Sequence, residues 1–337
     1  IVGLFVQGLA PFGYVLGLTV PRVDLFVLPA VGTVSLPALV FVGARVFWGL
    51  GSAFVFIGAF AIITGVTDQS NRGRWTGYMR AGQSMGFPTG LVVGGIVADV
   101  FDIQTAFLAA GTLALAAGVL GWYVLPDVQP EGTDGRTPRL RDLPDTVRSL
   151  PGVLPIGLAN AGVRLLFGGV LLTTAVQYAD YLGLTIGTLT AAGVSGLVTG
   201  LGVVASAGAT VVSGRVSDTV DSRAVVTLPG FALLAAGYAL LALSGTLTGV
   251  TAGIVLVGAG TGAVGPALLA TLGDIAPGDE LGRLAGVYNV FGDIGLSVGP
   301  LAALPIAEAV GFTPTYLACA GVAVACLLLV NATLLKA

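Results

Sequence analysis

Three charged side chains stand inside long apolar stretches of this 337-residue sequence: Arg45, Arg164 and Asp293. A charge at the centre of a bilayer costs roughly 2.5–3.5 kcal/mol on insertion scales, so such residues usually face a cavity or a partner. Asp293 lies ~14 Å and Arg164 ~17 Å into its stretch, at 1.5 Å per helical residue. The similar depths would let the two side chains pair. Asp293 would then either bind a proton or cation, with Arg164 tuning its pKa, or belong to a buried structural ion pair.

Four polar residues are candidates for lining the same cavity. Asn160 lies one helical turn from Arg164, and Asn289 lies one turn from Asp293, so each shares a helix face with its charge. Tyr288 is five residues from Asp293 and need not share its face. The full set of cavity-lining candidates is Asn160, Gln177, Tyr288 and Asn289.

Missing residue types exclude several classes of chemistry. The sequence has no histidine, which excludes Ser-His-Asp catalysis, histidine metal sites and histidine proton relays. The only lysine is Lys336, so there is no Walker A loop. Cys319 and Cys326 are seven residues apart on one expected helix, where they cannot pair, and are interpreted as small packing residues. We therefore expect no enzyme activity, no metal and no cofactor, and the net charge of −3 argues against a nucleic-acid partner.

The stretches that must position these groups are long and apolar. Hydrophobic residues make up 55% of the chain and charged residues only 9%, whereas soluble domains carry about 25% charged residues. Apolar runs near or above ~20 residues predict membrane-spanning helices rather than strands, which would alternate apolar and polar residues. The sequence thus predicts an all-α, multi-pass membrane protein, with residues 21–36 as a loop. The ten expected spans are 1–20, 37–66, 75–98, 104–125, 153–178, 186–213, 224–244, 247–272, 284–309 and 314–335.

Basic residues alternate between the ends of the expected spans. Arginines mark the loops near 72–80, 215–223 and 283 and the segment 126–152, whereas the intervening loops lack them, with Arg22 as the exception. Because positive residues stay on the cytoplasmic side, the long segment and the C-terminus should be cytoplasmic. The bias toward Asp and Arg, with abundant Ala, Gly and Val, suggests the plasma membrane of a salt-adapted prokaryote.

The sequence repeats itself weakly at an offset of 209 residues. Gly49 matches Gly258, Gly86 matches Gly295, and Gly73-Arg74 matches Gly282-Arg283. Residues 37–125 then correspond to 247–335, and 153–213 have no counterpart, so we expect two helices before Ile1. The expected domains are an N-terminal bundle (1–125), a cytoplasmic linker (126–152) and a six-helix C-terminal bundle (153–337). Parallel repeats of this kind are a transporter architecture with a site between the halves.

Three motifs resemble those of the major facilitator superfamily. Residues 45–53, from Arg45 to Ala53, are similar to its fourth-helix motif, R-x-x-q-G-x-g-a-a, with Trp48 at the glutamine position. The expected helix 75–98 is similar to the fifth-helix motif of the antiporter branch, with Leu91 in place of its proline. The loop from Gly214 resembles a worn copy of G-x-x-x-D-R-x-G-R-R. The motif positions are Gly77, Gly86, Pro88, Gly90, Gly94 and Gly95, their counterparts Gly299 and Pro300, and the loop residues Gly214, Asp218 and Arg223.

The resemblance implies a two-bundle fold, of which this chain holds ten of twelve helices, and a proton-transfer role for Arg45. Independently, Gly82, Gly86, Gly90 and Gly94 form a bare stripe that would allow a close helix contact, either a rocking interface or static packing. Asp218 and Arg223 would form a cytoplasmic latch or an ordinary charged turn.

The sequence predicts a monomeric secondary transporter of the drug/proton antiporter type, truncated at its N-terminus. It would export small, partly hydrophobic molecules across the bilayer by alternating access, with the proton as coupling ion. Two alternatives remain at this point. One is a facilitator or importer of sugars or organic acids with the same fold. The other is a membrane scaffold or receptor that does not transport.

Overall fold

A computed structural model describes residues 1–28, 32–67, 72–126, 152–275 and 281–335. Contacts divide the chain into two compact units, which are described separately: residues 1–86 with 94–135, and residues 87–93 with 136–337. Most of the predicted linker 126–152 lies outside the described residues, so the linker and the predicted domain boundaries remain predictions.

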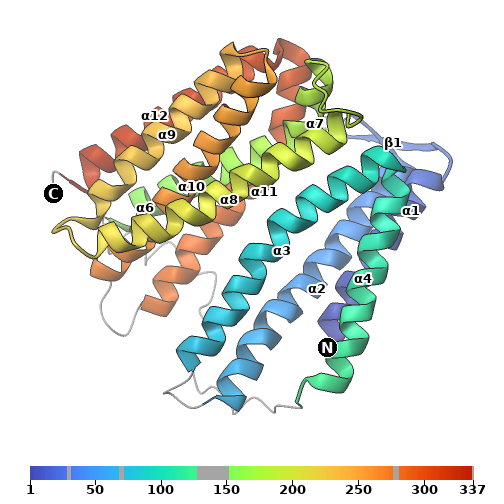
Figure 1. Cartoon of the computed structure of the whole chain (residues 1–337), viewed down its shortest axis with the longest axis horizontal. Coiled ribbons are helices and arrows are strands. Elements are labelled where there is room, and N and C mark those ends of the chain that lie inside the picture. The colour runs from blue at the N-terminus through green and yellow to red at the C-terminus, as the bar shows by residue number, and fades with distance from the viewer. Residues whose placement is uncertain (29–31, 68–71, 127–151, 276–280, 336–337) are drawn as a thin grey trace. The chain divides into compact units, whose positions relative to one another are not determined.

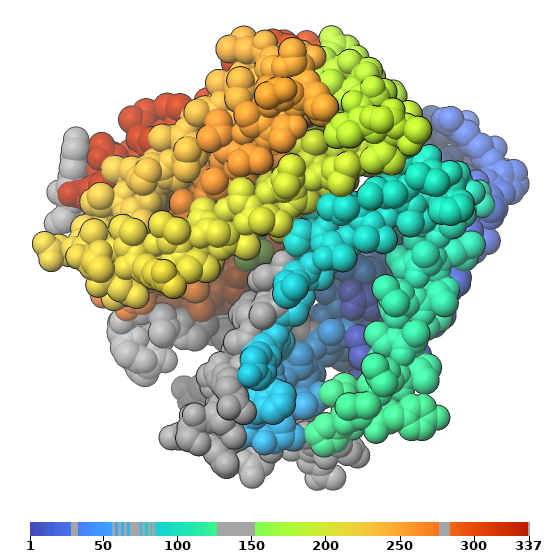
Figure 2. Space-filling model, in the orientation of Figure 1, coloured from blue at the N-terminus to red at the C-terminus, as the bar shows by residue number. Residues whose placement is uncertain are grey.

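The described residues of the first unit lie mainly in α1 (Val2–Thr19), α2 (Leu36–Val66), α4 (Ile103–Val124) and all but the central part, 87–93, of α3 (Arg72–Val100) (Figure 1). Helix α1 packs against both α2 and α4. Within this packing, the Tyr14 ring lies 6.2 Å from the Phe41 ring and 5.2 Å from the Phe107 ring, measured between centroids. The space-filling view shows the unit hollowed between α3 and α4 (Figure 2).

A short hairpin precedes α2, where the sequence predicted only a loop. Strands β1 (Asp24–Leu28) and β2 (Gly32–Ser35) pair antiparallel, with Phe26 opposite Val34. Pro21, one of the prolines that suggested a loop, precedes β1 and does not interrupt it. It therefore removes no ladder hydrogen bond, and the β-branched and aromatic residues of β1 can pair.

Where the structure describes the second unit, six segments are long and apolar enough to span a membrane. The first is composite: α6 (Val153–Arg164) and α7 (Leu172–Tyr181) are joined by a π-helical segment, η2 (Leu165–Leu171). After it come α8 (Ala191–Ser217), a 3₁₀ turn η3 (Arg223–Val226), α9 (Thr227–Leu243), α10 (Leu247–Ile275), α11 (Leu281–Val310) and α12 (Phe312–Thr333) (Figure 1). Their core includes the fully buried side chains of Ile156, Leu166, Phe231, Tyr238 and Tyr316.

The predicted span 153–178 corresponds to one apolar helical segment, Val153–Tyr181, whose central part is π-helical, which periodicity does not reveal. One predicted boundary in this unit was wrong. The next span begins at Ala191 rather than residue 186, because Gly183 and Gly187 take positive φ angles of 63° and 61° and turn the chain. An isolated bridge between Ile186 and Leu189 closes this turn.

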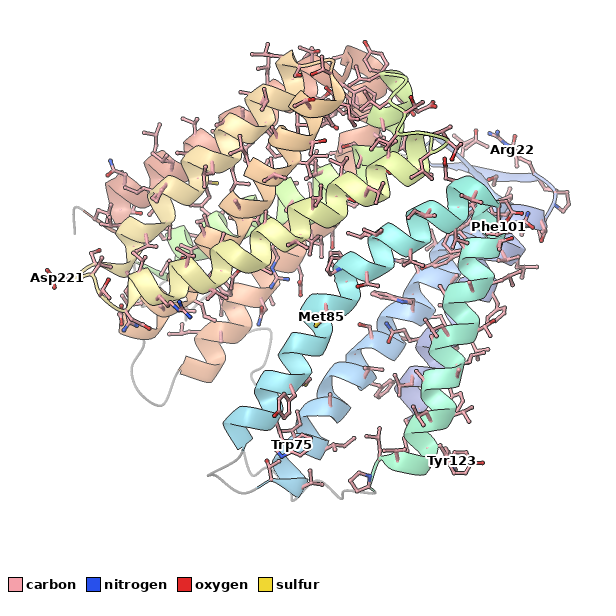
Figure 3. The ribbon with its side chains drawn as sticks, viewed as in Figure 1. Arg22, Trp75, Met85, Phe101, Tyr123 and Asp221 are labelled. Carbon is pink, nitrogen blue, oxygen red and sulfur yellow. The ribbon has the colours of Figure 1, made fainter. Side chains whose placement is uncertain are left out.

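The all-α, multi-pass class is confirmed. Among the described residues, nine helical segments are long and apolar enough to cross a membrane. In the tenth predicted span, α3, the stretch Met85–Val100 is an apolar helix of 10–17 residues. At the two ends of the first unit, Figure 3 shows Trp75 and Tyr123 on one side and Arg22 and Phe101 on the other. Such aromatic residues are typical of helix ends at the membrane–water interface.

Candidate functional site

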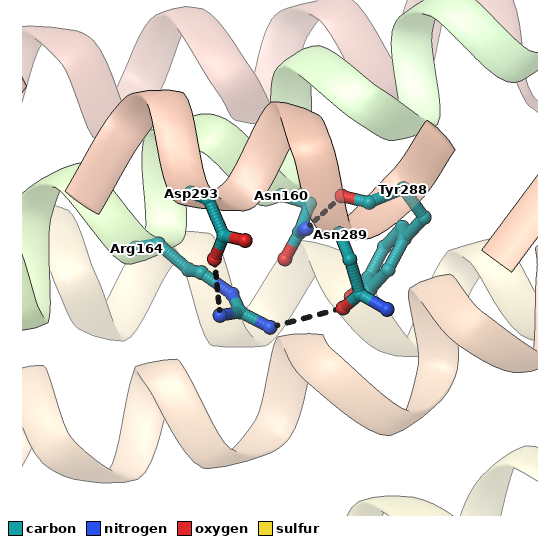
Figure 4. A network of polar contacts seen from close by, with 5 residues as sticks. All are labelled: Asn160, Arg164, Tyr288, Asn289 and Asp293. Carbon is teal, nitrogen blue, oxygen red and sulfur yellow. Dashed lines mark hydrogen bonds and ion pairs between the residues drawn. The ribbon is translucent and has the colours of Figure 1, made fainter. Parts of the chain in front are cut away.

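An ion pair joins α6 to α11 in the second unit. Arg164 is the last residue of α6, and its Nη1 lies 3.3 Å from Oδ1 of Asp293 on α11 (Figure 4). The same guanidinium donates through Nη2 to Oδ1 of Asn289, at 3.4 Å. One cation is thus shared between a carboxylate and an amide one helical turn apart on α11. The structure therefore brings together three of the residues predicted to form the site.

A buried hydrogen bond sits beside this pair. Asn160, one turn before Arg164, is 4% exposed, and its Nδ2 donates to the backbone carbonyl of Tyr288 at 2.7 Å (Figure 4). The close approach depends on Gly292. A Cβ at that position would lie 2.6 Å from Asn160 Nδ2 and 2.7 Å from Arg164 Cδ. Sequence reasoning missed Gly292, because one glycine among 53 carries no distinguishing signal.

The Asp293 carboxylate is open on one side. Its side chain is 67% exposed, compared with 38% for Arg164. It borders a shallow groove of about 360 Å³ on α11, lined by Val290, Asp293, Ile294, Ser297 and Val298. In contrast, the Tyr288 side chain points toward α10, where its hydroxyl lies 3.5 Å from the Gly265 carbonyl. The groove therefore presents the Asp293 carboxylate and the Ser297 hydroxyl among apolar side chains.

Two predicted residues make no described hydrogen bond or ion pair with this network. Gln177 is exposed on α7, beyond the π segment, and among the described residues it is not part of the network. Arg45 lies on α2 in the first unit, where its guanidinium carbon stands 4.7 Å from the centroid of the Trp48 ring. Trp48, which departs from the family motif, thus holds Arg45 by a cation–π contact rather than by an amide.

The glycines predicted to form a helix interface behave differently in the two units. On α11, a Cβ at Gly295 would overlap the carbonyl oxygen of Ala161, and Gly299 lies against Gly169 of η2. On α3, no described atom of the first unit lies within 4 Å of a Cβ at Gly86 or Gly94. The motif prolines do not end their helices: Pro88 lies inside α3 and Pro300 lies inside α11. The remaining motif glycines, Gly77, Gly90 and Gly95, also lie within α3.

The predicted latch between Asp218 and Arg223 is not formed among the described residues. Arg223 instead pairs with Asp274 near the end of α10, at 3.2 Å between Nη1 and Oδ1. Asp218 is exposed at the end of α8, and Gly214 lies one turn earlier. Adjacency along the loop suggested the wrong acidic partner, because the turn at η3 directs Arg223 toward α10.

The profile of the Major Facilitator Superfamily matches residues 4–300 and, in a second match, residues 158–336. The chain belongs to the Major Facilitator Superfamily. The relatives and structural neighbours of this superfamily member are transporters, and the chain is accordingly a multi-pass transporter rather than an enzyme.

Relatives of this superfamily member include proteins named for drug resistance. The "Multi-drug resistance efflux pump PmrA" of Streptococcus pneumoniae is 27% identical over 297 residues, which cover 85% of this chain and 72% of PmrA. "Multidrug resistance protein 1" of Bacillus subtilis is 33% identical over 93 residues, or 27% of this chain and 24% of that protein.

Solved structures of superfamily members share the fold. A bacterial homologue of the human lysosomal transporter Spinster, in an inward-facing conformation, matches 99% of this chain and 84% of its own, with a TM-score of 0.69 and 15% identity. The nucleoside transporter NupG, in a mutant form, matches with a TM-score of 0.71 and 12% identity, over 99% of this chain and 84% of its own.

Proposed function

We propose that this transporter exports small, partly hydrophobic molecules in exchange for protons, and that Asp293 is the coupling residue. The observation that carries the proposal is the Arg164–Asp293 pair, which lies about twelve residues, or ~18 Å, into α11. A charged pair at this depth is expensive and is usually retained for a functional reason. The name of the relative PmrA, an efflux pump for several drugs, supports the direction and class of substrate.

The geometry suggests how a proton would act. Ionised Asp293 attracts Arg164, and the groove beside it gives a proton a route to the exposed carboxylate oxygen. Protonation removes the negative charge, so the attraction that ties α6 to α11 weakens. Asn289 still accepts a hydrogen bond from Arg164, which keeps the guanidinium partnered while the pair is broken. The two protonation states would then favour two different conformations, as alternating access requires.

The test uses inside-out membrane vesicles that contain the protein expressed from its complete reading frame. A proton gradient, acid inside, is imposed, and uptake of a panel of lipophilic dyes and drugs is followed. Asp293→Asn should abolish gradient-driven uptake, with a loss of about a hundredfold or more, because the neutral amide cannot exchange a proton. The matched control is Asp221→Asn, the same change in the exposed turn between α8 and η3 (Figure 3), which should leave uptake unchanged.

The outcomes separate the alternatives. Undiminished gradient-driven uptake in Asp293→Asn would falsify the coupling role of Asp293. Uptake that ignores the gradient in both proteins would indicate a facilitator, and a counterflow assay with sugars and organic acids would then identify its substrate.

We further propose that the protein is a monomer in the prokaryotic plasma membrane with its C-terminus in the cytoplasm. The support is the distribution of arginines among the loops, which follows the positive-inside rule. Accessibility of a C-terminal tag to a protease in intact cells and in inside-out vesicles tests the orientation.

A further inference from the structure

The π-helical segment η2 begins directly after Arg164. The backbone N–H of Leu172 bonds to the carbonyl of Phe167, five residues earlier. In an α-helix the corresponding bond reaches the residue four positions earlier. π-helical turns are rare and are frequently found at functional sites. A turn that holds one extra residue also rotates the helix on one side of it relative to the other. The direction of the Arg164 side chain therefore depends on whether η2 keeps this geometry.

A tyrosine from another helix holds η2. The Tyr238 hydroxyl of α9 donates a hydrogen bond to the backbone carbonyl of Leu166. Both residues are 0% exposed, so water cannot replace this bond. Other carbonyls of η2 accept hydroxyls from within the same span, as Gly169 does from Thr173 at 2.6 Å. Among the described residues, Tyr238 makes the side-chain hydrogen bond that reaches η2 from a separate helix.

The opposite side of η2 rests on the helix that carries Asp293. A Cβ at Gly168 would lie 2.5 Å from Leu296 Cδ1, and a Cβ at Gly169 would lie 3.0 Å from Gly299 Cα. These contacts on α11 follow Asp293 by one to two turns. The η2 segment is thus held between Tyr238 on one side and α11 on the other, and its first neighbour along the chain is the arginine that pairs with α11.

We propose that Tyr238 is a positioning residue of the coupling site: its hydroxyl keeps η2 π-helical, and this geometry holds Arg164 against Asp293. The inference rests on the proposed function for its role in transport, but not for its structural part. If η2 changed from π-helical to α-helical geometry, α6 would rotate relative to α7 by about 100°, the angle of one helical residue. Arg164 would then be turned away from Asp293. The ion pair and the Tyr238 hydrogen bond therefore support the same conformation of η2.

Hydrogen–deuterium exchange tests the structural part, on the detergent-purified protein. Tyr238→Phe removes only the hydroxyl and should accelerate exchange of a peptide covering Leu165–Leu171 by about tenfold, the scale of one hydrogen bond. Exchange in α8 should stay within about twofold. The matched control is Tyr316→Phe, since Tyr316 is also 0% exposed but its hydroxyl contacts the Thr174 hydroxyl of α7, at 2.9 Å. Unchanged η2 exchange in Tyr238→Phe, or equal acceleration in Tyr316→Phe, would overturn the proposal.

A second measurement leaves Tyr238 in place, in case its variant fails to reach the membrane. Asp293→Asn removes the ion pair, and the proposal expects faster exchange in η2 here too. If exchange in η2 does not change, the ion pair and the π-helical geometry are independent, and the proposal is wrong. This readout does not require transport, so it remains decisive even if Asp293→Asn retains gradient-driven uptake and the proposed function fails.

Transport then tests the role in coupling. In vesicles, Tyr238→Phe should lower gradient-driven uptake by about tenfold while gradient-free counterflow stays within about twofold. A general structural defect would lower both rates together. Equal losses in the two assays would contradict a positioning role, and Tyr316→Phe should lower neither.

Discussion

Leu268 and Leu272 of α10 are fully buried in the second unit, in the core cluster to which α6 also contributes. Their counterparts 209 residues earlier, Ala59 and Ile63 of α2, line an apolar cavity of about 570 Å³ in the first unit. The repeated pattern makes the same helix faces apolar in both units. Whether such a face becomes a core depends on a further helix that packs against it, as α6 does in the second unit. The helix face that lines the cavity in the first unit is thus the counterpart of a face that is core in the second unit.

Polar residues differ between the repeats as well. The positions of Asn289 and Asp293 are occupied by Arg80 and Ser84 in the first unit. The acidic site thus belongs to the second repeat alone, whereas the motif arginine, Arg45, belongs to the first. The two copies of one helix pattern therefore carry different polar residues, although Gly86 and Gly90 match Gly295 and Gly299.

The largest expected difference between the units concerns those glycines. Gly295→Ala would place a Cβ into the carbonyl oxygen of Ala161, which is backbone and cannot move cheaply. It should lower the free energy of unfolding by about 3 kcal/mol or more. Gly86→Ala, the equivalent change on α3, meets no described atom of its unit and should gain about 0.5–1 kcal/mol from helix propensity. Thermal unfolding of the two purified variants in the same detergent measures the difference.

An equally large loss of unfolding free energy in Gly86→Ala would contradict this prediction. It would mean that the glycine face of α3 is covered in the folded protein in the same way as that of α11.

A smaller difference concerns two tyrosines in matching aromatic pairs. Tyr14 packs against Phe107 as Tyr238 packs against Tyr316, at centroid distances of 5.2 and 5.7 Å. The Tyr14 hydroxyl is buried without a hydrogen-bond partner among the described residues. Tyr14→Phe should therefore leave the unfolding free energy unchanged or raise it by up to about 1 kcal/mol, whereas Tyr238→Phe should lower it by about 1–2 kcal/mol. The melting temperatures of the two variants measure this difference. An equal decrease in both would contradict the prediction and would mean that the Tyr14 hydroxyl also has a hydrogen-bond partner.

The smallest expected effect is a pH dependence at the start of α4. The Asp102 side chain accepts the Thr105 backbone N–H at 2.6 Å, and this hydrogen bond holds the pKa of Asp102 below its ordinary value. A carboxyl whose pKa is lowered by folding stabilises the helix above its unfolded pKa, and this contribution is lost as pH falls through the folded value. Hydrogen exchange at the first turn of α4 should therefore accelerate, after correction for intrinsic rates, as the pH falls from about 5 to about 3.

The equivalent residue of α12 serves as the control. It is Gly311, which has a φ of 91° and no side chain to titrate. Asp102→Ala should remove the pH dependence of α4, and α12 should show none. The same pH response in both helices would point to a cause other than the cap.

The spans, their apolar faces and the charged residues within them could be predicted from the sequence. Hydrophobic run length decides whether a helix crosses a bilayer, and this depends on local composition rather than on contacts. The pairing of Arg164 with Asp293 could also be predicted, since counting residues from the helix ends places both side chains at a similar depth. Strand pairing in residues 24–35 was not predicted, because prolines at the edges of strands resemble prolines in a loop.

Other features depended on the tertiary structure. The bond from Tyr238 to Leu166 and the choice of Asp274 by Arg223 both join residues more than 50 positions apart. Their energies depend on the distance and direction between helices, which periodicity does not encode. Gly292 shows the same limit, since a missing side chain matters only when another helix occupies its place. The sequence thus determines which residues lie in the membrane and which faces are apolar, and helix packing determines which polar groups meet.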